Sequence, residues 1–153
     1  MINEFGYSFG TEFSKDFSKG FVDVRFRALT SKNRQLDFRI YAGAFFNNNT
    51  TSDYFSFGLD RANDYLFQLN YFGRSEDSGI FSQQIIIAEG GFKSMLDTPF
   101  ANQWMTTANF STSIWRYIQA YGDIGLVKNK FESANFVYDS GIRLNLVEDF
   151  FEL

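Results

Sequence analysis

The 153-residue chain contains no cysteine and no histidine, and its single proline is Pro99. Without cysteine, a disulfide framework, a thiol nucleophile and a thiolate metal site are all excluded. Without histidine, the commonest general base and the commonest zinc ligand are missing, which excludes Ser-His-Asp catalysis and H-E-x-x-H metallopeptidase chemistry in this segment. We therefore predict no catalytic residue, no cofactor-binding residue, no metal ligand and no cofactor here.

Long hydrophobic runs and an excess of positive charge are also absent. No stretch approaches the ~18 apolar residues of a membrane-spanning helix. Residues 1–5 lack the basic and apolar regions of a signal peptide. The 14 basic and 18 acidic residues give a formal net charge of -4, without a basic patch that would suggest nucleic acid as a partner.

Aromatic residues are abundant instead, at 20% of the chain with 21 phenylalanines, and apolar residues recur with a period of two. The pattern is clearest in residues 138–146, where Ile142 and Leu144 alternate with Asp139 and Arg143. A β-strand points successive side chains to opposite faces, so this stretch has one apolar and one charged face. The chain is therefore predicted to be all-β.

The alternation predicts an antiparallel meander of seven to nine strands and no helix. The strands are expected at residues 4–13, 21–29, 36–46, 80–92, 102–115, 117–127 and 134–147, with a bulge at Gly90-Gly91. Polar turns are expected at residues 14–20, 30–35 and 93–100. Residues 47–79 are predicted to be a long loop excursion from the sheet, rather than two short strands at 54–60 and 65–72, with 47–53 and 73–79 exposed.

A β-structure with one apolar and one ionic face closes either as a membrane barrel with a polar lumen or as a soluble barrel with an apolar lumen. Three features favour the membrane barrel. The strands are long, and aromatic residues that can form interfacial girdles stand near their ends: Tyr54, Trp104, Trp115, Tyr117 and Tyr138. The polar face also combines opposite charges that could pair across a lumen: Asp23 with Arg25 and Arg27, Asp37 with Arg39, and Asp139 with Arg143.

We therefore expect residues 1–153 to form a single domain or fragment of an outer-membrane-type β-barrel. Because the chain stops at residues 150–153, inside what looks like a new strand, we expect an internal piece of a longer protein whose closing strands are missing. The expected orientation places these side chains on the convex surface: Val24, Phe26, Ile142, Leu144 and Leu146. It places these on the concave side: Asp23, Arg25, Arg27, Asp139, Arg143 and Asn145.

Two pairs of adjacent carboxylates, Glu76-Asp77 and Glu148-Asp149, are the only candidates for a cation site. Neighbouring residues on a strand point to opposite faces, so only a loop would let such a pair converge. We interpret both pairs as solvated surface charge.

Several segments together resemble the C-terminal region of large Bacteroidetes metallopeptidases of the gluzincin, aminopeptidase-like class. These segments are residues 60–67, 71–79, 88–93, 101–107 and 138–144, and the similarity runs from about residue 36 onward. The resemblance implies an upstream zinc peptidase domain carrying H-E-x-x-H and a downstream glutamate. Zinc is implied only for that domain, and no catalytic residue can be transferred to this chain.

The resemblance further implies a non-catalytic barrel in the bacterial outer membrane that anchors or positions the peptidase domain. Its partners would be the lipid bilayer and its own upstream domain. Two alternatives stay open. The strand-loop-strand order also resembles, more weakly, the surface-antigen-type barrels of outer-membrane transport and assembly proteins. A soluble β-barrel that binds an apolar ligand is the third reading.

Overall fold

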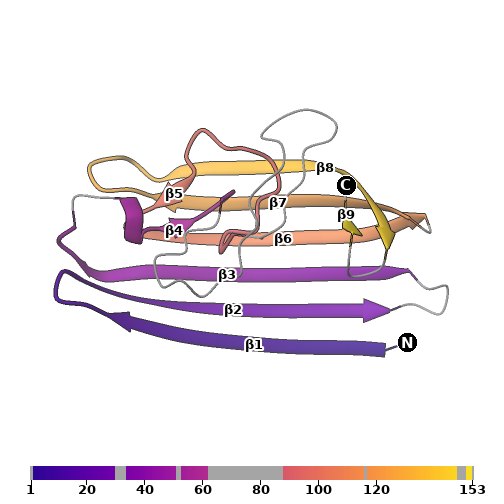
Figure 1. Ribbon diagram of the computed structural model, residues 1–153, viewed down its shortest axis with the longest axis horizontal. Coiled ribbons are helices and arrows are strands. Elements are labelled where there is room, and N and C mark those ends of the chain that lie inside the picture. The colour runs from indigo at the N-terminus through magenta and orange to yellow at the C-terminus, as the bar shows by residue number, and fades with distance from the viewer. Residues whose placement is uncertain are drawn as a thin grey trace.

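The computed structural model describes residues 2–29, 34–50, 53–61, 88–115, 117–147 and 151–152. They form one antiparallel sheet in the order β1-β2-β3-β6-β7-β8-β9 and a two-stranded sheet of β4 and β5 (Figure 1). The strands are β1 (Ile2–Phe13), β2 (Phe17–Leu29), β3 (Gln35–Asn48), β4 (Phe57–Gly58), β5 (Phe100–Ala101), β6 (Trp104–Trp115), β7 (Ile118–Lys128), β8 (Asn135–Val147) and β9 (Phe151–Glu152). One turn of 3-10 helix, η1 (Asp53–Phe55), precedes β4.

This architecture confirms the predicted all-β antiparallel meander over the described part of the chain. Each strand of the large sheet pairs antiparallel with its neighbour. The sheet does not close on itself within the described ranges, because β1 forms one edge and β9 the other. No helix in these ranges is long and apolar enough to cross a membrane.

Several predicted boundaries move because hydrogen bonding extends the strands into polar sequence. β2 begins at Phe17, so the first turn is residues 14–16 rather than 14–20. β3 continues to Asn48, whose side-chain amide donates to the carbonyl of Asn102 at 2.8 Å. The first two residues of the predicted 47–53 loop therefore belong to a strand. Residues 65–72, 73–79 and both carboxylate pairs lie outside the described ranges.

The excursion from the sheet is longer than predicted, because β3 pairs directly with β6. Residues 88–92 are therefore not a strand of the large sheet, and the predicted bulge at Gly90-Gly91 is a turn closed by a hydrogen bond from the Gly91 amide to the Ala88 carbonyl. The backbone amides of Gly90 and Phe92 donate to the carbonyls of Gly58 and Leu59. Residues 53–61 and 88–101 thus bind each other, and we call them the inner segment.

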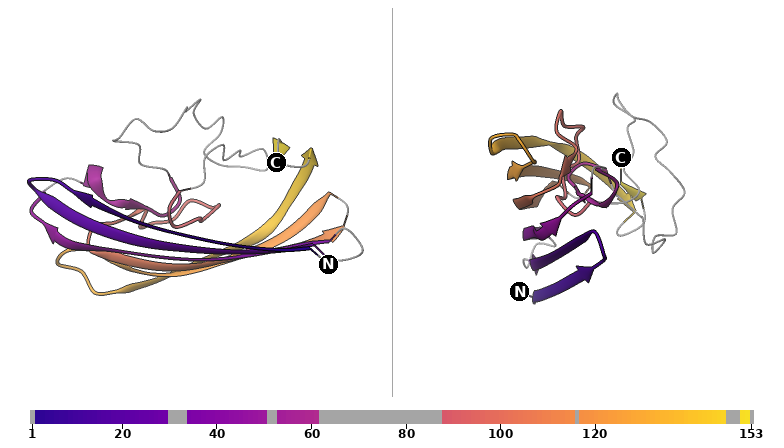
Figure 2. Two further views of the ribbon diagram at one scale, coloured as in Figure 1. Left: turned by 90° about the horizontal axis from the view of Figure 1, so that it is seen from below. Right: turned by 90° about the vertical axis from the view of Figure 1, so that its left-hand side faces the viewer.

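The large sheet is curved, and the inner segment lies on its concave side (Figure 2). A buried core joins the two, formed by Tyr41, Phe57, Leu59, Phe92, Ala101, Met105 and Val127. Gly43 on β3 makes this approach possible, because a Cβ atom at that position would lie 2.8 Å from the ring of Phe57. The hydrophobic core of the described chain is therefore not between two sheets but between one sheet face and an inward-folded segment.

Candidate functional site

The convex face of the sheet carries rows of apolar side chains that the strand register places directly opposite one another. One row crosses six strands through Tyr7, Val24, Ile40, Ala108, Ile124 and Tyr138. A second contains Phe5, Phe26, Phe38 and Phe110. Many of these side chains are open to the surroundings, including Tyr7 at 72% and Ile124 at 52% exposure. Contiguous exposed apolar surface of this kind is typical of protein–protein interfaces and of membrane contact sites.

The predicted orientation of the two faces is confirmed where side chains are described. Ile142 is 71% exposed on the convex face, while its neighbour Arg143 lines a cavity on the concave side and Asp139 is buried there. On β2, Val24 and Phe26 belong to the convex rows, whereas Asp23 is buried under the concave contacts. The side chains of residues 144–146 are not among those described.

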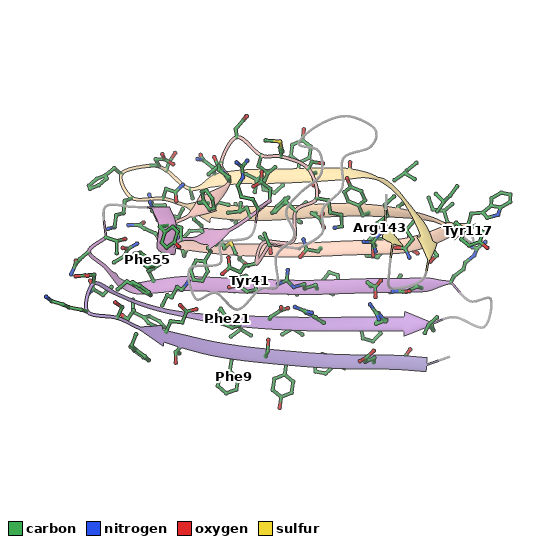
Figure 3. All side chains as sticks on the ribbon, in the orientation of Figure 1. Phe9, Phe21, Tyr41, Phe55, Tyr117 and Arg143 are labelled. Carbon is green, nitrogen blue, oxygen red and sulfur yellow. The ribbon has the colours of Figure 1, made fainter. Side chains whose placement is uncertain are left out.

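Of the five aromatic residues predicted near strand ends, some stand there and others do not. Trp104 and Trp115 begin and end β6, and Tyr117 follows in the turn. Figure 3 places Tyr117 and Phe55 near opposite ends of the sheet. Tyr54, however, lies in η1 of the inner segment. Tyr138 lies inside β8, opposite Ile124, because β8 already begins at Asn135.

The middle of the concave face is a polar row across the same six strands. Its members, directly paired in register, are Gly6, Arg25, Arg39, Asn109, Asp123 and Asp139. Arg39 donates to the Asn109 side-chain oxygen at 3.4 Å, and the Asn109 amide donates to Asp123 at 2.9 Å. Hydrogen bonds thus join the three central members of this set, which we call the polar row.

The inner segment is bound to the polar row by charges and backbone groups. The Lys93 ammonium lies 2.7 Å from an Asp123 carboxylate oxygen, with the Lys93 side chain 18% and the Asp123 side chain 0% exposed. The backbone amides of Lys93 and Ser94 both donate to one oxygen of Asp139, at 3.0 and 2.7 Å. The Asn109 amide also donates to the Gly90 carbonyl at 3.0 Å. These contacts fix the position of the segment above β6, β7 and β8.

Gly91 is where the inner segment comes closest to the polar row. Its φ is +77°, a conformation that L side chains rarely adopt. A Cβ atom there would lie 2.6 Å from the Asn109 side-chain oxygen and 2.9 Å from an Arg39 nitrogen. Only glycine fits this position.

Opposite charges on the polar face do pair, and the strand register decides which of them meet. Arg27 lies directly opposite Asp37 and donates to it at 2.8 Å. Asp23 accepts from Arg25 at 2.7 Å and from Arg39. Of the combinations expected on the polar face, Asp23 with Arg25 is therefore found. Asp37 meets Arg27 rather than Arg39, and among the described residues no ion pair joins Asp23 to Arg27 or Asp139 to Arg143.

Arg143 instead forms hydrogen bonds to the Gln119 side-chain oxygen at 2.8 and 2.6 Å. It belongs to a cavity of ≈ 820 Å³ on the concave side. The charged residues that line this cavity are Glu4, Glu12, Asp23, Arg25, Arg27, Asp37, Arg39, Glu89, Lys93 and Arg143. The lining therefore combines five acidic and five basic groups. Among the residues that the structure describes, no group of three or more carboxylates is placed to hold a metal ion.

Among the titratable groups of the inner segment, Glu89 has the pKa that its surroundings shift most clearly. Burial raises the pKa of the Glu89 carboxyl above its ordinary value, against the opposing effects of the Gly58 backbone amide that donates to it and of the positive charge on Lys19. Lys19 is itself buried, with its ammonium 4.9 Å from the centre of the Phe57 ring and 3.3 Å from the Phe55 carbonyl oxygen.

The sequence shows only that the residues that hold the inner segment lie on the polar face of their strands. Asn109 and Asp123 belong to the polar halves of their alternating strands, but nothing local pairs either of them with Lys93. Comparisons of the chain with protein-family models, with curated proteins and with solved structures give no match.

Proposed function

We propose that this chain is a non-catalytic segment of a β-barrel in the bacterial outer membrane, with its convex face against lipid. The observation that carries this proposal is the apolar row from Tyr7 to Tyr138, which is continuous across six strands and points away from the inner segment. Charged side chains on a lipid face cost ~2–4 kcal/mol at the bilayer midplane, and the described charges of the polar row all point the other way.

The strand lengths agree with this reading. The six long strands contain between 11 residues, in β7, and 14 residues, in β3. Each is therefore long enough for a tilted membrane strand, which needs ~9–11 residues. Trp104 and Trp115 stand at the two ends of β6, where amphipathic rings would meet the headgroup regions on either side.

The concave face argues against the soluble alternative. A soluble barrel for an apolar ligand needs an apolar interior, because unpaired buried charge is costly. The concave side instead contains Asp23, Arg39 and Asp123 in ion pairs, and its apolar core is already filled by the inner segment.

We propose anchoring or positioning of an upstream zinc metallopeptidase domain as the role of the barrel. The filled concave side supports a holding role, and the peptidase part of the proposal rests on the resemblance to the gluzincin class. A transport or assembly barrel is the second candidate, favoured by the polar cavity beside Arg143. Reading the gene upstream for H-E-x-x-H separates these two roles.

Single cysteines test the membrane orientation without background, because the chain has none of its own. Ser8 and Phe9 are adjacent on β1, so Ser8→Cys and Phe9→Cys place a spin label at matched depth on opposite faces. After reconstitution in lipid vesicles, we expect the Phe9→Cys and Ile124→Cys labels to collide with oxygen, which dissolves in the bilayer. The Ser8→Cys label should collide with a water-soluble nickel chelate. Labels at both faces that are equally open to the chelate would contradict the lipid contact.

A further inference from the structure

Two carboxylates of the polar row, on Asp123 and Asp139, lie directly opposite each other on β7 and β8. Both are on the concave side beneath the inner segment, at 0% and 8% exposure respectively. Antiparallel cross-strand pairs hold their Cβ atoms ~4.5–5.5 Å apart, so two like charges in this position destabilise the sheet unless something lies between them.

Three of the four carboxylate oxygens have hydrogen-bond donors. One oxygen of Asp123 accepts from the Lys93 ammonium, and the other accepts from the Asn109 amide. Oδ2 of Asp139 accepts from the backbone amides of Lys93 and Ser94. Oδ1 of Asp139 is buried and has no hydrogen-bond partner, although the side chain lies within hydrogen-bonding reach of Asp123. Two acceptor groups therefore meet without a donor.

The charges around this pair do not supply the missing donor. Lys93 provides one positive charge for two carboxylates, and its ammonium stands 4.7 Å from the centre of the Tyr121 ring. Arg39 is engaged by Asp23, and Arg143 by Gln119. Glu89 accepts from Gly58 and would only add negative charge. The pair is thus one positive charge short, in a place where an unsatisfied acceptor is costly.

We propose that Asp123 and Asp139 share one proton, and that this proton locks the inner segment onto the sheet. The proton lies between Asp139 Oδ1 and the Asp123 carboxylate, while Asp139 Oδ2 continues to accept from the amides of Lys93 and Ser94. When the proton passes to solvent, the two facing carboxylates repel each other. This repulsion disfavours the position of the Asp139 side chain that holds the amides of Lys93 and Ser94. A rise in pH therefore releases the inner segment. A metal ion is a poorer occupant, because the Lys93 ammonium already fills the cation position at Asp123.

The test uses Asp139→Asn, which replaces the shared proton by a permanent one. Its side-chain amide can donate to Asp123, and its oxygen can still accept from Lys93 and Ser94. The readout is the hydrogen exchange of the Lys93 and Ser94 amides, corrected for intrinsic exchange, across a pH series. The experiment is done in a Glu89→Gln background so that Glu89 does not contribute. Once the pH is high enough to remove the proton, we expect the equilibrium constant for docking of the inner segment in the parent to fall about tenfold per pH unit. The same constant should not change with pH in Asp139→Asn.

Asp37→Asn is the matched control, because Asp37 is a part-exposed carboxylate paired with Arg27 on the same face. It should retain the pH dependence of the parent. Infrared spectroscopy gives an independent readout, since the parent should show the carbonyl stretch of a protonated carboxylic acid that Asp139→Asn lacks. Equal pH profiles for parent and Asp139→Asn would overturn the proposal. So would an inner segment that fails to dock in Asp139→Asn at any pH, or docking abolished by a chelator of divalent cations.

Discussion

Arg39 on β3 donates two hydrogen bonds to Asp23 on β2, from Nε and Nη2 to the two carboxylate oxygens, each 2.9 Å long. Two-point pairing of this kind fixes both position and orientation. Arg39 also reaches Asn109, so the pair connects the N-terminal strands to the polar row that holds the inner segment. The contact between these two residues therefore links the charged face of the sheet into one unit.

Removing Arg39 should cost more stability than removing any exposed arginine of the same face. Arg39→Met leaves Asp23, which is 5% exposed, with only the largely exposed Arg25 as its partner. We expect a loss of about 3 kcal/mol in the free energy of unfolding, measured by urea titration in lipid vesicles. Arg27→Met breaks an exposed pair and should cost less than about 1 kcal/mol. Equal losses would show that the network does not act through Asp23.

A charge on the convex face should be costly only in the middle of a strand. Ile124→Lys lies in the middle of β7 and should reduce the free energy of folding into vesicles by ~2–4 kcal/mol. Ile114→Lys, close to the end of β6, makes the same change and should cost only ~0–1 kcal/mol. Both side chains are about half exposed, so similar and small effects at the two positions would contradict the lipid contact.

Two glycine substitutions test whether the inner segment needs the close contact between Gly91 and the polar row. Gly91→Ala puts a side chain at positive φ and against Asn109, so we expect at least about 1 kcal/mol of destabilisation and faster hydrogen exchange in residues 88–94. Gly122→Ala lies on the convex face with nothing within 4 Å of the new atom. It should leave exchange in the inner segment unchanged. An effect of the same size from Gly122→Ala would contradict the close-packing argument.

The inner segment should depend on its buried aromatic residues. Phe57 and Phe92 are both fully buried, and truncation of such a ring typically costs ~3–5 kcal/mol. Phe57→Ala should therefore detach the inner segment, which limited proteolysis would detect as new cleavage within residues 53–61 or 88–101. Phe131→Ala, at a fully exposed turn position, is the control and should leave the cleavage pattern as it is in the parent.

The titration of Glu89 should make the folded protein less stable as the pH rises. Because burial raises the folded-state pKa of Glu89 above its ordinary value of 4.5, its favourable contribution is complete below 4.5 and is lost as the pH rises through the folded value. Glu89→Gln keeps an acceptor for the Gly58 amide and removes the titration. In a background of Asp139→Asn, we expect the pH dependence of unfolding over this interval to disappear in Glu89→Gln. Its persistence would assign the dependence to another group.

The strands and the two faces of the sheet could be predicted from the sequence because both follow from a period of two. Residues such as Ile142 and Asp139 show their faces by simple alternation. The boundaries were less predictable at Phe17 and Asn48, where backbone pairing continues into polar sequence. Local composition does not show that a neighbouring strand will supply the next hydrogen bond.

The inner segment could not be predicted, because its residues look like a strand and a loop when taken alone. Residues 88–92 contain the glycine pair expected of a bulge, yet their amides bind Gly58 and Leu59, far away in sequence. The individual partners of most charged residues could not be predicted for the same reason. Whether Asp37 meets Arg39 or Arg27 is decided by the register between two strands, and alternation within one strand carries no information about register.

The direct pairing of β3 with β6 has a consequence for the order in which the chain assembles. β1, β2 and β3 are successive hairpin partners and can pair locally, whereas β3 and β6 meet only after residues 49–103 have been looped out. Closing that loop costs entropy before any contact within it forms. The core around Phe57 needs β3, β6 and β7 to be in place as its floor. We therefore expect the inner segment to fold after β3, β6 and β7 have paired, so that the sheet determines the shape of the segment that covers it.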